Sequence, residues 1–186
     1  DYRVIYLKYY GNTSLYKSRV NSDFFTTKSG QISPYDDLIK AYAEEIDWDW
    51  RLLTSLVYQE SGFDPNTTSW AGAHGLMQLM PETAAEYGID STANPRENIE
   101  AVVDYLKWLE DQFSERVSDS LERRQFVLAS YNVGLGHVFD AMRLATKNEL
   151  NPQVWKGNVA EMILKKSNPK YYRDPVVHYG YCRGSE

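Results

Sequence analysis

One glutamate in the sequence stands where a carboxyl group can act as a general acid. Glu60 lies three residues after Val57 and seven after Leu53, so on a helix it continues their apolar stripe. A carboxyl group at the edge of an apolar core is poorly solvated, which disfavours its charged form and raises its pKa. Such a group stays protonated near neutral pH and can donate a proton. The alternative is a solvated glutamate at a helix end, and the spacing alone leaves both interpretations open.

Other common catalytic signatures are absent from the sequence. It contains no G-x-S-x-G, no P-loop, no G-x-G-x-x-G after a strand and no H-E-x-x-H. The three histidines, His74, His137 and His178, lie far apart without the spacing of metal ligands, and we interpret them as surface or core residues. Cys182 is the only cysteine, which excludes an intrachain disulfide and a cysteine-based zinc site. We therefore predict no metal site.

Composition narrows the class of protein. The 186 residues carry 20 Lys and Arg against 26 Asp and Glu, a net charge of −6, and no long basic block. This balance argues against binding to a nucleic-acid phosphate backbone. No apolar run approaches the ~18 residues of a membrane span. Aromatic residues make up 14% of the chain, which we interpret as a well-packed core; the alternative is a groove that stacks sugar rings.

Residues 1–32 differ from the rest of the chain. Asp1–Tyr10 is rich in β-branched and aromatic residues, Gly11–Ser14 is typical of a turn, and the stretch up to Gly30 has no periodic pattern. We predict an extended linker here, or the tail of a preceding domain. The remaining chain, residues 33–186, has the length of a single domain.

From Ser33 onward apolar residues repeat at helical spacing, which predicts a mainly α fold with no strand after residue 33. Ser33 is predicted to cap the first helix, with Pro34 at its first position. Gly62 is predicted to end the second helix, and Gly134 and Gly136 to separate two later ones. The predicted helices span residues 34–46, 49–61, 81–88, 96–113, 121–131, 138–145 and 158–165, and residues 66–81 are predicted to form an ordered loop.

Three motifs include or follow Glu60. They are Tyr58–Phe63 (YQESGF), Gly75–Pro81 (GLMQLMP) and Ala129–Gly134 (ASYNVG), in this order and spacing. Together they resemble the catalytic domain of lytic murein transglycosylases of the soluble-transglycosylase (SLT) family, which is related to goose-type lysozyme. The resemblance implies a mainly α, lysozyme-like SLT domain over residues 33–186, preceded by a short extended N-terminal segment.

The resemblance also implies roles for residues that match the motifs. Glu60 matches the family's single catalytic acid/base, which would protonate the glycosidic oxygen between N-acetylmuramic acid and N-acetylglucosamine. It would then accept the proton of the muramyl 6-hydroxyl, which attacks its own C1 to give a 1,6-anhydro sugar. No metal or organic cofactor is implied. The substrate-binding residues implied in the same way are Ser69, Gln78, Met80, Tyr131 and Asn132, whereas Ser61 and Met77 are predicted to be structural.

Residues outside the motifs resemble a membrane-bound branch of the family. Lys8–Gly11, Tyr42–Trp48 and Tyr179–Gly184 match that branch, in which a solute-binding-like N-terminal domain precedes the catalytic domain. The resemblance implies that residues 1–32 follow such a domain, missing here, and that the enzyme acts on peptidoglycan glycan strands in the periplasm, at the outer membrane. Family members usually continue past this stretch into a final helix, so we expect the domain to be truncated at its C-terminus.

A single carboxylate is chemically sufficient for this reaction. Glycoside hydrolases use a second carboxylate ~5–9.5 Å from the first, whereas attack by a hydroxyl of the substrate itself needs only one acid/base. The nearest later carboxylate is Asp64, four residues past Glu60 and before Pro65, which we interpret as a turn or cap residue. Two alternatives stay open: a lysozyme-like hydrolase in which Asp64 positions water, and a non-catalytic module that binds muropeptides.

Overall fold

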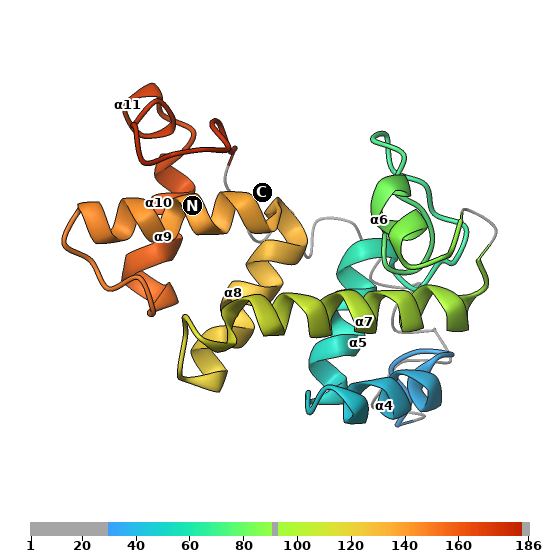
Figure 1. Cartoon of the computed structure of the whole chain (residues 1–186). Coiled ribbons are helices and arrows are strands. Elements are labelled where there is room, and N and C mark those ends of the chain that lie inside the picture. The colour runs from blue at the N-terminus through green and yellow to red at the C-terminus, as the bar shows by residue number, and fades with distance from the viewer. Residues whose placement is uncertain (1–29, 91–92, 184–186) are drawn as a thin grey trace, which may run out of the picture. The chain divides into compact units, whose positions relative to one another are not determined.

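A computed structural model describes residues 30–90 and 93–183 of the chain (Figure 1). The predicted extended segment 1–32 lies almost entirely outside these residues. The chain divides into two compact units, an N-terminal unit, Asp1–Val103, and a C-terminal unit, Asp104–Glu186. Within the described residues every regular element is a helix, which confirms the predicted mainly α fold. None of these helices is long and apolar enough to cross a membrane.

The described part of the N-terminal unit contains α4 (Asp36–Glu45), α5 (Trp50–Ser61), α6 (Pro81–Glu86) and the first part of α7 (Pro95–Ser114). Each corresponds to a predicted helix, and α4 packs against α5. Burying an aliphatic side chain contributes ~1.5–3 kcal/mol, so a shared core holds these helices together. Its fully buried side chains are Ile39, Leu53, Val57, Leu76, Met77, Ile99 and Val102.

The start of α4 differs from the prediction. The helix begins at Asp36 with Tyr35 in the capping position, so the prediction that Ser33 caps it directly is wrong. Ser33 and Asp36 are both buried, and the Ser33 backbone N–H and hydroxyl each donate to Asp36 Oδ1 at 2.8 Å. The Ser33 hydroxyl in turn accepts from the backbone N–H of Tyr35 at 3.1 Å. The Ser33 hydroxyl therefore still accepts a hydrogen bond from a backbone N–H at the start of the helix, but Ser33 itself lies two residues before the capping position.

The C-terminal unit contains the end of α7, α8 (Ser120–Val133), α9 (Leu135–Lys147), the π-helical turn η1 (Trp155–Val159), α10 (Ala160–Lys165) and α11 (Pro169–Tyr172) (Figure 1). Helix α9 packs against both α8 and α10. Helix α9 begins three residues earlier than predicted, and α11 was not predicted because its four residues are too few for a periodic pattern. Phe113 and Phe126 are fully buried, with ring centroids 5.5 Å apart.

The prediction that Gly136 separates two helices is wrong, because it lies inside α9 and Gly134 alone separates α8 from α9. A Cβ at position 136 would lie 2.4 Å from a ring carbon of Tyr179. The glycine is therefore required by the close approach of the tyrosine ring to the helix, a contact that the local sequence does not reveal.

A buried ion pair holds the last described segment onto α9. Asp140 and Lys166 are both fully buried, and Lys166 Nζ donates to Asp140 Oδ2 at 2.6 Å. The same carboxylate accepts from the backbone N–H groups of His178 at 2.7 Å and Tyr179 at 2.9 Å, and pairs with Arg143. Burial alone would raise the pKa of Asp140, but these hydrogen bonds lower it. The pair thus fixes a segment that has no regular structure of its own.

His137 belongs to the same cluster. Its Nδ1 lies 2.9 Å from Lys166 Nζ. Burial and the neighbouring Lys166 charge lower the pKa of His137, and burial lowers the pKa of Lys166 against the opposing effect of Asp140. The histidine is a partner in an internal polar cluster, in line with its interpretation as a surface or core residue.

Candidate active site

Glu60 occupies the last turn of α5, on the helix face that Leu53 and Val57 bury. Its side chain is half-buried, and burial raises the pKa of its carboxyl group above the ordinary value of 4.5. No described residue of the N-terminal unit donates a hydrogen bond to this carboxyl or pairs with it. Desolvation without a compensating donor favours the protonated form. This is the environment that the spacing predicted for a general acid.

The end of α5 is built by local hydrogen bonds. Gly62 has a left-handed backbone with φ of 62°, and its N–H donates to Tyr58 O at 2.9 Å. The Ser61 hydroxyl donates to Val57 O at 3.2 Å, and the Ser61 carbonyl accepts from Asp64 N–H at 3.2 Å. Glycine terminates the helix because it adopts this backbone conformation without strain. These bonds support the structural interpretation of Ser61.

Asp64 is exposed, and its Oδ1 accepts from the backbone N–H of Asn66 at 2.9 Å. Its carbonyl accepts from Thr67 N–H at 3.4 Å. A carboxylate that bonds the backbone two residues on is typical of a turn. These contacts favour the turn interpretation over a role in positioning water.

Ser69 shapes the loop that follows. Its N–H donates to Ala73 O at 2.9 Å, and its Oγ accepts from Ala73 N–H at 3.0 Å. Gly72 N–H closes the turn onto Ser69 O at 3.0 Å. The serine is half-buried, and because its hydroxyl acts as an acceptor here, its own hydrogen stays available to a ligand.

Gln78 is hydrogen-bonded to two backbone carbonyl groups of the same loop. Its Nε2 donates to Thr67 O at 3.0 Å and to Gly75 O at 2.9 Å, and its backbone has a positive φ of 49°. Both amide hydrogens are used in this way, which leaves the side-chain oxygen as an acceptor. Met80 follows at the capping position of α6 with 41% of its surface exposed. The bond to Thr67 therefore holds the Gln78 side chain against the loop segment that leads into Ser69.

Gly75 and Met77 have structural roles in this loop. A Cβ at Gly75 would lie 2.6 Å from Asn98 Nδ2, and Asn98 Oδ1 accepts the Met77 N–H at 2.9 Å. Met77 is fully buried, which fits its interpretation as core. The side chain of Asn98 thus fixes the loop to the start of α7.

Tyr131 and Asn132 end α8 in the C-terminal unit. The Tyr131 ring lies 5.9 Å from that of Tyr105, which stacks on Trp108 at 5.8 Å. Asn132 is exposed. Tyr131 is thus anchored in an aromatic row, while Asn132 projects from the helix end.

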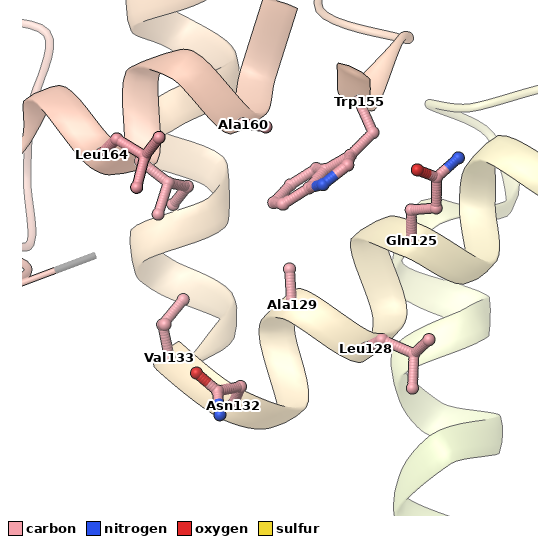
Figure 2. Close-up of a pocket in the computed structure, with 9 residues that line it drawn as sticks. Gln125, Leu128, Ala129, Asn132, Val133, Trp155, Ala160 and Leu164 are labelled. Carbon is pink, nitrogen blue, oxygen red and sulfur yellow. The ribbon is translucent and has the colours of Figure 1, made fainter. Parts of the chain in front are cut away.

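Asn132 borders a pocket of about 420 Å³ in the C-terminal unit. Figure 2 shows the indole ring of Trp155 over Ala129, with Leu164 and Gln125 on opposite sides. Sequence analysis did not single out Trp155 or Gln125, although Gln125, Ala129 and Asn132 repeat at helical spacing. No group of three or more His, Cys, Asp or Glu side chains in the described residues is arranged to hold a metal ion.

Comparisons with known proteins identify the family. The model of the family described as "Transglycosylase SLT domain" matches residues 37–154. The chain therefore belongs to the SLT transglycosylase domain family, as the three motifs predicted.

Particular relatives share the printed name "Membrane-bound lytic murein transglycosylase F". The protein from Pseudomonas fluorescens (strain Pf0-1) is 36% identical over 96% of this chain and 36% of its own length. The protein from Maricaulis maris is 38% identical over 88% of this chain and 35% of its own length. The chain thus spans about a third of the length of these relatives.

A solved structure supports the fold. The X-ray structure of an inactive mutant of the lytic transglycosylase Slt from Pseudomonas aeruginosa matches 95% of this chain and 31% of its own chain, with a TM-score of 0.50 and 21% identity. The mainly α, lysozyme-like SLT fold predicted from the sequence is therefore confirmed.

Proposed function

We propose that this chain is the catalytic domain of a peptidoglycan lytic transglycosylase, which cleaves the β-1,4 bond between N-acetylmuramic acid and N-acetylglucosamine. Two facts support the proposal: the chain belongs to the SLT family, and its relatives carry the name of a lytic murein transglycosylase. The observation that carries the mechanism is Glu60, a half-buried carboxyl group whose pKa is raised by burial.

Glu60 acts first as an acid and then as a base. In its protonated form it donates a proton to the glycosidic oxygen as the bond to the muramyl C1 breaks. The resulting carboxylate accepts the proton of the muramyl 6-hydroxyl as this oxygen bonds to C1, which yields a 1,6-anhydro end without water. The tethered hydroxyl has a high effective concentration, so no second carboxylate is needed. The turn contacts of Asp64 fit this assignment.

Five further residues bind the substrate in this proposal. The Ser69 hydroxyl donates to the substrate near an N-acetyl group, and the Gln78 side-chain oxygen accepts from a sugar hydroxyl or amide. The exposed Met80 side chain supplies an apolar contact. Tyr131 and Asn132 contribute from the end of α8. No metal or organic cofactor takes part.

The cellular setting belongs to the same proposal. The substrate is the glycan strand of peptidoglycan, and the domain works in the periplasm at the outer membrane, behind a solute-binding-like N-terminal domain. The greater length of the relatives and the words "membrane-bound" in their names support this setting.

The test is mass spectrometry of the muropeptides released from purified peptidoglycan by the wild type, Glu60→Gln and Asp64→Asn. We expect products one water lighter than reducing sugars from the wild type and from Asp64→Asn. General acid–base catalysis contributes ~10²–10⁴-fold, so Glu60→Gln should release at least ~100-fold less while still binding peptidoglycan.

Other products would contradict the proposal in a defined way. Reducing-end products, lost in Asp64→Asn, would show that water is the nucleophile and that the enzyme is a hydrolase. Release at the wild-type rate by Glu60→Gln would remove the assignment of the acid/base.

A further inference from the structure

The N-terminal unit contains a pocket that the proposed reaction does not use. Its volume of about 310 Å³ lies at the lower end of the ~300–1,000 Å³ usual for small-ligand sites. Its lining comes from the loop that follows α5, from helix α6 and the segment after it, and from the first part of α7. Neither Glu60 nor any of the five proposed substrate-binding residues lines it. We call it the α6 pocket.

The lining of the α6 pocket is mostly apolar, with three polar side chains. The polar side chains are His74, Asp90 and Asn98. Asp90 is the only Asp, Glu, Lys or Arg in the lining, so a cationic ligand group is attracted here and a carboxylate is repelled. The apolar side chains are those of Leu79, Pro81, Ala84, Ala85 and Ile89.

Asn98 has a donor that the fold leaves unused. Its side chain is only 4% exposed, and its Oδ1 accepts from Met77 N–H at 2.9 Å. Because a backbone N–H can only donate, this bond fixes which end of the amide is the oxygen. Asn98 Nδ2 donates to no acceptor among residues 30–90 and 93–183. A buried side chain with an unused N–H donor is uncommon, and here it points to an acceptor group on a ligand.

His74 connects the α6 pocket to the loop of the candidate active site. Its Nδ1 lies 2.7 Å from Thr68 Oγ1, and its backbone N–H donates to Leu79 O at 3.1 Å. Both partners form antiparallel bridges with His74. Thr68 precedes Ser69 in the chain and Leu79 follows Gln78. A ligand in the pocket therefore contacts the loop that carries two of the proposed substrate-binding residues.

We propose that the α6 pocket binds a small ammonium compound with an apolar body and a carbonyl group, such as an amino-acid amide. The ammonium group pairs with Asp90, the carbonyl oxygen accepts from Asn98 Nδ2, and the apolar body lies against Leu79 and Ile89. The binding site does not depend on the proposed function, because no step of the cleavage reaction involves it.

The test uses leucinamide as the probe, because it combines an ammonium group, a carbonyl group and a branched apolar side chain. The full chain, labelled with ¹⁵N, is titrated while the side-chain amide resonances of Asn98, assigned from triple-resonance spectra, are followed. We expect these resonances to shift in a saturable manner. N-acetyl-leucinamide, which lacks the charge, should bind at least ~fivefold more weakly. No binding of leucinamide at millimolar concentration, or binding that leaves the Asn98 resonances in place, would overturn the proposal.

A matched pair of variants tests the role of the carboxylate without disturbing the core. Asp90 and Glu86 are both exposed, and only Asp90 lines the pocket. Asp90→Asn should weaken leucinamide binding at least ~fivefold and remove the preference over N-acetyl-leucinamide. Glu86→Gln on α6 should bind leucinamide as the wild type does. Equal affinity of the two variants would contradict the proposal.

Hydrogen exchange gives an independent measurement on the same loop. The His74 N–H is bonded to Leu79 O, and the opening that exposes it would separate two residues that line the pocket. A ligand that binds only the closed loop slows this exchange by a factor of 1 + [L]/Kd, which is about tenfold when leucinamide is present at ten times its Kd. An unchanged exchange rate would place the ligand elsewhere and contradict the proposal.

Discussion

Two buried carboxyl groups, one in each unit, have pKa values shifted in opposite directions. Glu60 is half-buried, no described residue of its own unit donates to it, and burial raises its pKa. Asp140 is fully buried, but Lys166 and the backbone N–H groups of His178 and Tyr179 donate to it, and its pKa is lowered. Burial disfavours charge at both sites, so the donors decide which protonation state the fold selects. The pKa is therefore raised at Glu60 and lowered at Asp140, where the hydrogen-bonded carboxylate fixes the chain.

The largest stability effect is expected at the C-terminal cluster. Lys166→Met removes one partner of a buried ion pair and leaves Asp140 partly uncompensated, which should lower the free energy of unfolding by about 3–5 kcal/mol. The matched control is Lys107→Met, which breaks the exposed pair with Asp104 and should cost less than about 1 kcal/mol. Urea denaturation of both variants measures the difference. Equal losses would show that the buried pair does not anchor the segment.

The contributions of Asp140 and Glu60 to the free energy of unfolding should change with pH in opposite directions. Asp140 has a lowered pKa, so its contribution to stability is present above 3.8 and is lost as the pH falls through the lower folded-state value. Glu60 has a raised pKa, so its contribution is present below 4.5 and is lost as the pH rises through the higher folded-state value.

Matched isosteric variants measure these slopes. With rising pH, the wild type should lose stability relative to Glu60→Gln in the window just above 4.5. With falling pH, it should lose stability relative to Asp140→Asn below 3.8. Denaturation curves from pH 2 upward would give both differences. Slopes of the same sign would contradict the contrast between the two carboxyl groups.

Cleavage should also fall about tenfold per pH unit above the pKa of Glu60, because the acid must be protonated.

The two sites also differ in how far the sequence reveals them. The environment of Glu60 follows from local spacing, since Leu53, Val57 and Gly62 set the buried face and the end of one helix. Asp140 and Lys166 are 26 residues apart, and no periodic pattern links them. The same limit applies to Gly136, whose need for a small side chain comes from Tyr179. Local periodicity thus predicts helices and their buried faces, whereas contacts between distant segments appear only in the structure.

The smallest effect on the free energy of unfolding is expected from a substitution at Ser130, a buried polar residue without charge. It is fully buried on α8, and its Oγ has no hydrogen-bond partner among the described residues. An unsatisfied buried hydroxyl costs ~1–3 kcal/mol, so Ser130→Ala should raise the free energy of unfolding by about 1 kcal/mol.

The control separates this gain from helix propensity. Ser55 on α5 is exposed, and its hydroxyl donates to Arg51 O at 2.8 Å. Alanine is the better helix former at both positions by a few tenths to ~0.5 kcal/mol, so Ser55→Ala measures that contribution together with the loss of one exposed hydrogen bond. A larger gain at Ser130 than at Ser55 would assign the difference to the unpaired hydroxyl. Equal gains would show that the Ser130 hydroxyl has a hydrogen-bond partner. Glu60 would then be the better example of a polar group that is buried without one.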